Sequence, residues 1–93
     1  MTEVKQYRKK PVIIEAMQLN AGKRGNLEVV INWAGASQWH VDMDNHDECY
    51  ICLSTPEGTM KARNGDWVIR GVKGEFYPCK PDIFEQTYDE VTE

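Results

Sequence analysis

The chain has 93 residues, with three Trp, four Tyr and two Phe, and a net charge of −4. This length fits one domain, which we expect over residues 1–93, and the aromatic content argues against a disordered chain because such side chains bury enough surface to offset the ordering entropy. The acidic balance argues against a general nucleic-acid coat, which is usually basic.

An odd number of cysteines and the lack of an apolar leader predict reduced thiols in a cytoplasmic protein. We expect no cofactor. No apolar run is long enough to cross a membrane. Charge is segregated along the chain: residues 1–24 carry +4, residues 25–60 carry −6 and residues 61–93 carry −2. The basic and acidic segments could contact a charged partner, although a solvated surface explains the same pattern.

The N-terminal part of the chain predicts one strand and one helix. Pro11 opens a strand over residues 12–19, which is β-branched at its start and alternates later. Residues 20–25 predict a loop, with Asn26 as the helix N-cap and Gly35 as the helix stop. The helix would present one apolar stripe at i, i+3, i+4 and i+7: Leu27, Val30, Ile31 and Ala34.

The rest of the chain alternates with period two and predicts an antiparallel meander. Its expected strands are residues 38–42, 48–55, 59–63, 67–70 and 75–77, with the pair Asn64-Gly65 as the strongest turn signal. Pro78 and Pro81 should end the last strand, since each lacks an amide proton. Asp82 would then cap one helical turn over residues 83–87, followed by an extended end.

These elements predict an α+β domain. We expect one helix packed on a mostly antiparallel sheet of five or six strands, which is rolled around that helix and could close partly into a barrel.

The pair Cys49 and Cys52 has the C-x-x-C spacing of zinc and redox sites, which His40, His46 and Cys79 could complete. A strand through this pair would instead send the two cysteines to opposite faces, so we expect ordinary thiols and no metal. The acidic run from Asp42 to Glu48 lacks the glycine and glutamate of an EF-hand loop. We therefore expect a solvated loop there, with weak divalent binding as the alternative.

Hydrolytic motifs are lacking, so we do not expect an enzyme. The ammonium of Lys80 could lower the thiol pKa of Cys79, but no base is identified beside that thiol. An enzyme would require His40 or His46 beside Cys49 or an acidic residue.

Seven aromatic residues could stack on bases or form the core: Trp33, Trp39, Tyr50, Trp67, Phe76, Tyr77 and Phe84. In the expected strand, Trp67 and Ile69 share one face while Val68 and Arg70 share the other. Core burial explains most of these aromatics. A pocket with an aromatic wall and Arg63, Arg70 or Lys80 would alternatively hold a nucleotide-like molecule.

Residues 65–84 read G-D-W-V-I-R-G-V-K-G-E-F-Y-P-C-K-P-D-I-F. This run, with residues 7–16 near the N-terminus, resembles small bacteriophage and prophage proteins of unknown activity. The resemblance implies a phage accessory protein in the host bacterial cytoplasm and supplies no catalytic or binding residue. Turns and strand interiors explain much of this run, but its charges are less well explained, so the candidate binding residues are Arg63, Arg70, Lys73, Glu75 and Lys80.

We expect a non-enzymatic module that binds a host or phage protein, with a nucleotide-like small molecule as the alternative ligand. We also expect a two-fold homodimer, because a small sheet domain leaves strand edges unpaired. The basic cluster of residues 8–10 could face the acidic loop of residues 42–48 across that interface.

Overall fold

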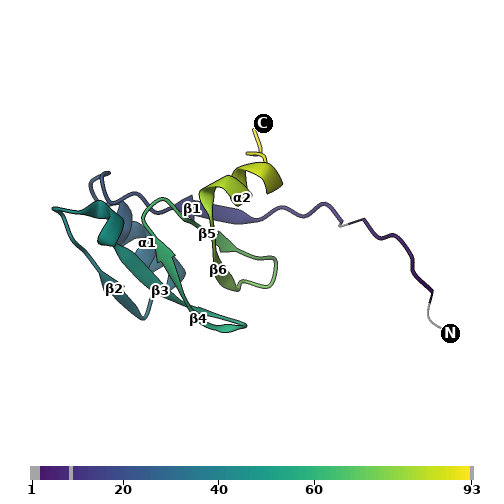
Figure 1. The fold of residues 1–93 in the computed structure, drawn as a ribbon, viewed down its shortest axis with the longest axis horizontal. Coiled ribbons are helices and arrows are strands. Elements are labelled where there is room, and N and C mark those ends of the chain that lie inside the picture. The colour runs from purple at the N-terminus through teal and green to yellow at the C-terminus, as the bar shows by residue number, and fades with distance from the viewer. Residues whose placement is uncertain (1–2, 9, 93) are drawn as a thin grey trace.

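Two three-stranded antiparallel sheets and two α-helices form the fold (Figure 1) over residues 3–8 and 10–92, which the computed structural model describes. The first sheet has the order β1-β5-β6, with β1 Glu15–Gln18, β5 Trp67–Arg70 and β6 Phe76–Cys79. The second sheet has the order β2-β3-β4, with β2 Gln38–His40, β3 Tyr50–Thr55 and β4 Gly58–Arg63. The helices are α1 Asn26–Ala34 and α2 Pro81–Thr87, and a 3₁₀ turn covers His46–Glu48. Neither α-helix is long and apolar enough to cross a membrane.

The α+β class and the antiparallel pairing are confirmed, but the prediction of five or six strands in one sheet, partly closed into a barrel, is wrong. The chain leaves the second sheet at the end of β4 and enters the first sheet at β5, whose neighbours are β1 and β6. The turn at Asn64-Gly65 is therefore a corner between two sheets. It is not the turn of a β4–β5 hairpin.

Hydrogen bonds tie this corner to the segment after β1. Asp66 O accepts the N–H of Leu19 at 2.8 Å, and Leu19 O accepts the N–H of Gly65 at 2.7 Å. Asn64 Oδ1 accepts the N–H of Ala21 at 2.8 Å. Gly65 has a φ of 94°, a backbone conformation that favours glycine. The end of β1 and the corner are thus held as one unit, although more than 40 residues separate them.

The main core lies between α1, the second sheet and one face of the first sheet. Its buried members are Leu19, Val30, Ala34, Ile51, Leu53, Ala62 and Val68. The predicted apolar stripe of α1 is confirmed, because Val30 and Ala34 are buried in this cluster and Leu27 and Ile31 pack against it.

Of the two predicted ends of α1, the C-terminal end is confirmed and the N-terminal cap is wrong. Gly35 ends the helix in the left-handed conformation with a φ of 62°, as expected. The predicted N-cap is wrong, since Asn26 is the first helical residue and Gly25 occupies the cap position. The Asn26 side chain turns back toward β1 instead: its Nδ2 donates to Gln18 O at 3.0 Å and its Oδ1 accepts the N–H of Asn20 at 2.7 Å.

The outer face of the first sheet carries a second apolar cluster under α2. Trp67 stacks on Phe84 of α2, with ring centroids 4.1 Å apart and planes 8° apart. Val68 points to the opposite face and joins the main core, so the predicted alternation along β5 is confirmed. Two local predictions are wrong here. β6 continues through Pro78, opposite Val68, and α2 has seven residues with no side-chain cap from Asp82.

The predicted strand over residues 12–19 is too long. β1 has four residues because β5, its partner, has four. Residues 3–14 without Lys9, here called the arm, run extended away from the body on the side opposite β2 (Figure 1). Val4 is fully exposed and Ile13 is 77% exposed. Lys9, part of the predicted basic cluster, lies outside the described residues.

Candidate binding groove

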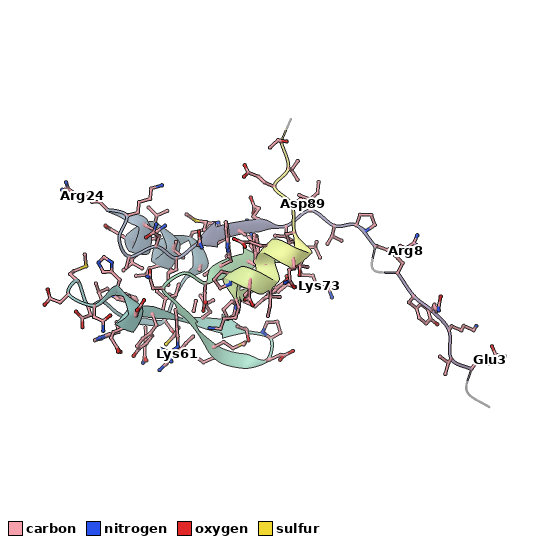
Figure 2. All side chains as sticks on the ribbon, turned by 45° about the horizontal axis from the view of Figure 1, so that its top comes forward. Glu3, Arg8, Arg24, Lys61, Lys73 and Asp89 are labelled. Carbon is pink, nitrogen blue, oxygen red and sulfur yellow. The ribbon has the colours of Figure 1, made fainter. Side chains whose placement is uncertain are left out.

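The five candidate binding residues lie around the two ends of β5. Arg63 and Lys80 are near Asp66, which precedes this strand, whereas Arg70, Lys73 and Glu75 surround the turn that follows it. Figure 2 shows the side chains on the ribbon, with Lys73 at the molecular surface. The structure does not bring the five into one site.

At the β5–β6 turn the charges have structural partners. Arg70 Nη1 lies 3.1 Å from Glu15 Oε1, across the β1–β5 pairing. Glu75 Oε1 accepts the N–H of Lys73 at 3.0 Å. A Cβ on Gly71 would stand 2.6 Å from the Glu75 carboxylate, so a larger residue there would displace the Glu75 side chain. Folding therefore explains much of the charge pattern in this part of the chain.

At the other end of β5, Asp66 is the buried charge, a role that the sequence did not single out. Its side chain is 6% exposed, and its Oδ2 accepts the N–H of Arg63 at 2.9 Å. Lys80 Nζ lies 3.4 Å from both carboxylate oxygens and is largely exposed. Lys80 is thus the partner of a buried carboxylate.

The cysteines are separate thiols. Cys49 and Cys52 are buried, and Cys49 Sγ lies 3.4 Å from Asp42 O, to which it donates. No group of three or more His, Cys, Asp or Glu among residues 3–8 and 10–92 could hold a metal ion. For Cys79, burial raises the thiol pKa above its usual 9.0, and the charges of Asp66 and Asp82 raise it further. The sequence left open a lowering of this pKa by Lys80, whereas in the structure the pKa of the Cys79 thiol is raised.

The acidic run between β2 and β3 bonds to its own backbone. Asp42 Oδ1 accepts the N–H groups of Asp44 at 2.9 Å and Asn45 at 3.1 Å. Asn45 Oδ1 accepts the N–H of Asp47 at 3.2 Å. These are the local turns that Asp and Asn side chains favour.

The two histidines lie in different surroundings. His40 stacks on Tyr50, with centroids 5.6 Å apart, on the outer face of the second sheet, where Lys61 Nζ is 4.3 Å from the Tyr50 centroid. His46 lines the groove described next. The two imidazoles therefore do not share one site.

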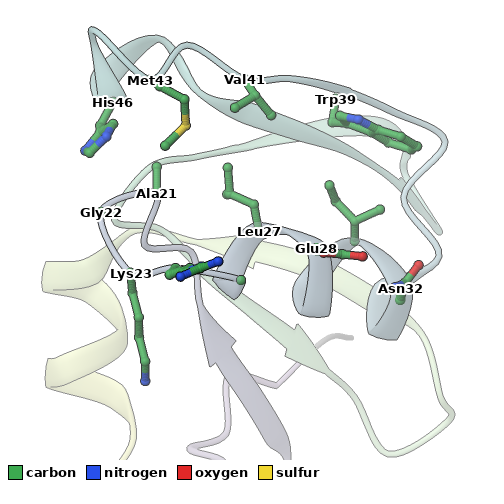
Figure 3. Close-up of a pocket in the computed structure, with 13 residues that line it drawn as sticks. Ala21, Gly22, Lys23, Leu27, Glu28, Asn32, Trp39, Val41, Met43 and His46 are labelled. Carbon is green, nitrogen blue, oxygen red and sulfur yellow. The ribbon is translucent and has the colours of Figure 1, made fainter.

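An open groove of about 630 Å³ separates α1 from the segment that continues β2. Figure 3 shows Trp39, Val41 and Met43 along one wall and Leu27 on the α1 side. Trp39 is 53% exposed and Met43 is 65% exposed, an unusual degree for large apolar side chains gathered in one place.

Charged groups stand at the margins of the groove. Lys23, Arg24 and Glu28 line it, and Figure 3 shows Lys23 toward the same end as His46 and Glu28 along α1. In Figure 3, Lys23 points away from the apolar wall. Between these margins the accessible lining is mainly apolar, which suits apolar side chains better than a phosphate.

The sequence contains the signal for this wall. Residues 38–44 alternate polar and apolar, with the apolar members at positions 39, 41 and 43. That alternation predicts a half-buried strand and by itself indicates no binding role. In the structure the pairing with β3 ends at His40, so the same alternation continues over an open groove.

Comparison of the chain with protein-family models, with curated proteins and with solved structures finds no match in any of the three. The phage resemblance therefore stays a prediction.

Proposed function

We propose that this chain is a non-enzymatic binding module, of the phage accessory kind, that takes an extended segment of a host or phage protein into the groove between α1 and residues 39–43. The observation that carries the proposal is the row of three large apolar side chains, Trp39, Val41 and Met43, exposed at alternate positions above the α1 stripe. Apolar surface gathered in this way is typical of a binding site.

The shape of the groove supports an extended segment as the ligand. Trp39 supplies a large, rigid anchor of the type enriched at interface hot spots. β2 lies at the edge of the second sheet, with β3 as its partner in the strand order. A bound segment that follows this edge would place every second side chain on the groove side, matching the spacing of positions 39, 41 and 43.

The alternative ligand, a nucleotide-like molecule, has less support. Phe84 covers one face of the Trp67 ring, Glu15 pairs with Arg70, and Lys80 faces the buried Asp66. Trp67, Arg70 and Lys80, three of the groups assigned to that ligand, thus already have partners within the chain.

A library of linear peptides displayed on particles tests the proposal with defined probes. We expect selection on the wild-type protein to enrich peptides with apolar residues at alternate positions. Met43→Asp should weaken their binding at least tenfold, because a carboxylate would be desolvated in the groove.

Val72→Asp is the matched control. Val72 is 68% exposed, slightly more than Met43, and it lies in the β5–β6 turn outside the groove. If the selected peptides bind Met43→Asp and Val72→Asp equally, the groove is not the site. The same holds if the library yields no peptide that binds the wild-type protein better than Met43→Asp.

A further inference from the structure

The second candidate surface is the open edge of β1 together with the arm that precedes it. β1 stands at the end of the strand order β1-β5-β6. Val12, Ile13 and Ile14 continue it in extended conformation beyond the reach of β5. Three consecutive β-branched residues have a strong preference for sheets, yet Ile13 is 77% exposed. Such an edge is a template for pairing with another strand.

Hydrogen bonding shows which backbone groups this edge offers. Leu19 N–H donates to Asp66 O, which continues the β1–β5 ladder. Because every second residue of an antiparallel strand bonds to the same neighbour, residues 15 and 17 face β5 and residues 12, 14 and 16 face the open edge. Gln18 O points to the same side and is taken by Asn26 Nδ2. Pro11 has no N–H to donate. Because the backbone groups of odd-numbered residues face away from the open edge, Pro11 removes no donor from it.

We propose that two copies of the chain pair along this edge across a two-fold axis, joining two first sheets into one continuous sheet. In the register that the structure favours, Ile14 lies opposite Ile14 of the second copy, and Val12 lies opposite Ala16 of the second copy. The open-edge groups of residues 12, 14 and 16 then all pair.

Neighbouring registers are poorer for named reasons. Residues that lie opposite one another in two paired strands share a face of the sheet. The second copy can therefore shift along the edge only by two residues at a time. One step forward opposes Glu15 with Glu15, a like-charge pair. A further step needs Gln18 O, which Asn26 already occupies. One step back opposes Ala16 with Lys10 of the second copy, which replaces the apolar pair of Ala16 and Val12 by a charged residue.

A cavity beside the edge supports the same partner. It has a volume of about 470 Å³ and is lined by Ile14, Ala16, Phe84 and Tyr88, among others. Ala16 pairs with Ile69, which shares the α2 face of the sheet with Trp67. In the proposed register, Val12 and Ile14 of the second copy lie on this same face, so the second copy covers the cavity.

Light scattering at about 50 μM protein tests the assembly. We expect twice the 10.7 kDa mass of one chain. Ile13→Asp should give the monomer mass, because the introduced carboxylate would face Glu15 of the second copy, and its exposed position lets the variant fold. Val4→Asp, farther along the arm, should stay dimeric. A wild-type monomer at this concentration, or a dimer unaffected by Ile13→Asp, would overturn the proposal.

Cysteine cross-linking then tests the register in a Cys79→Ser background. Opposed hydrogen-bonded residues stand about 5.5 Å apart, within disulfide range. Ile14→Cys should cross-link on oxidation and Ile13→Cys should not. Cross-linking at position 13, 15 or 16 in place of 14 would overturn this register. The basic arm and the acidic loop lie at opposite ends of the molecule (Figure 1), so a dimer held by those charges would cross-link at none of these positions and dissociate in salt.

Discussion

Asp66 shows how one residue can fix the relation between the two sheets. Its carboxylate accepts the Arg63 amide at the end of β4, its carbonyl accepts the Leu19 amide, and Lys80 approaches it from the start of α2. A buried carboxylate that accepts a backbone hydrogen bond is stabilising, whereas an ion pair with an exposed lysine contributes at most about 1 kcal/mol.

Asp66→Ala should therefore lower the free energy of unfolding by about 2–3 kcal/mol, because the Arg63 amide loses a buried carboxylate as its acceptor. Lys80→Ala should cost less than about 1 kcal/mol, since Lys80 is 60% exposed. Urea unfolding of the two variants measures both values. Equal losses of unfolding free energy in the two variants would mean that the ion pair with Lys80, and not the hydrogen bond from the Arg63 N–H, holds the corner.

The raised pKa of Cys79 has a kinetic consequence, because alkylation requires the thiolate. At pH 8, Cys79 should react more slowly with iodoacetamide than a free cysteine does. Asp82→Asn removes one of the charges that raise this pKa, so the rate should increase by about twofold, the size expected for an exposed charge. Mass spectrometry of the labelled chain follows the rate. Asp89→Asn serves as the control, and an equal increase in that variant would contradict the assigned cause.

At the scale of the element, α2 is held to the first sheet by few contacts. Phe84 stacks on Trp67 and also lies 5.1 Å from the Tyr88 ring. Ile83, its neighbour on α2, is exposed.

Phe84→Ala should cost about 1–3 kcal/mol, below the full cost of a core phenylalanine because the side chain is half-buried. Ile83→Ala should cost less than about 1 kcal/mol, the usual size for an exposed side chain. Thermal unfolding followed by Trp fluorescence compares the two. If both variants lose the same stability, the stack does not anchor the helix.

Elements of this chain were predictable where their signals are local. The α1 stripe, the stop at Gly35 and the bounds of β5 follow from periodicity and from glycine chemistry. The extent of β1 was not predictable, because it depends on the four residues of β5, about 50 positions away. The N-cap was mispredicted because the Asn26 side chain bonds to Gln18, eight residues earlier at the end of β1, and not to the amides of its own helix.

At the scale of the whole molecule, the arrangement of two sheets follows from pairings that period-two patterns do not encode. Alternation identifies a strand and its faces, but not its partner. The groove was missed for the same reason: the alternation of residues 38–44 was visible, whereas the end of its pairing at His40 was not. The charged candidate residues lie at the two ends of β5 instead, and several of them bond within the corner and the β5–β6 turn.

Both proposed surfaces are sheet edges in this arrangement, and they lie apart on the molecule. The β1 edge and the arm suit a second copy, and the β2 edge with its groove faces the other way (Figure 1). A dimer through β1 would therefore present two grooves, one in each copy, for a protein partner.

Photo-cross-linking in bacterial cells tests the groove most directly. A benzophenone amino acid is placed at position 43, within the groove, or at position 72, in the β5–β6 turn. We expect a discrete protein adduct from position 43 that is absent from position 72 and is lost when Trp39→Ala is added. No adduct at position 43, or the same adduct from both positions, would contradict the groove as the binding site.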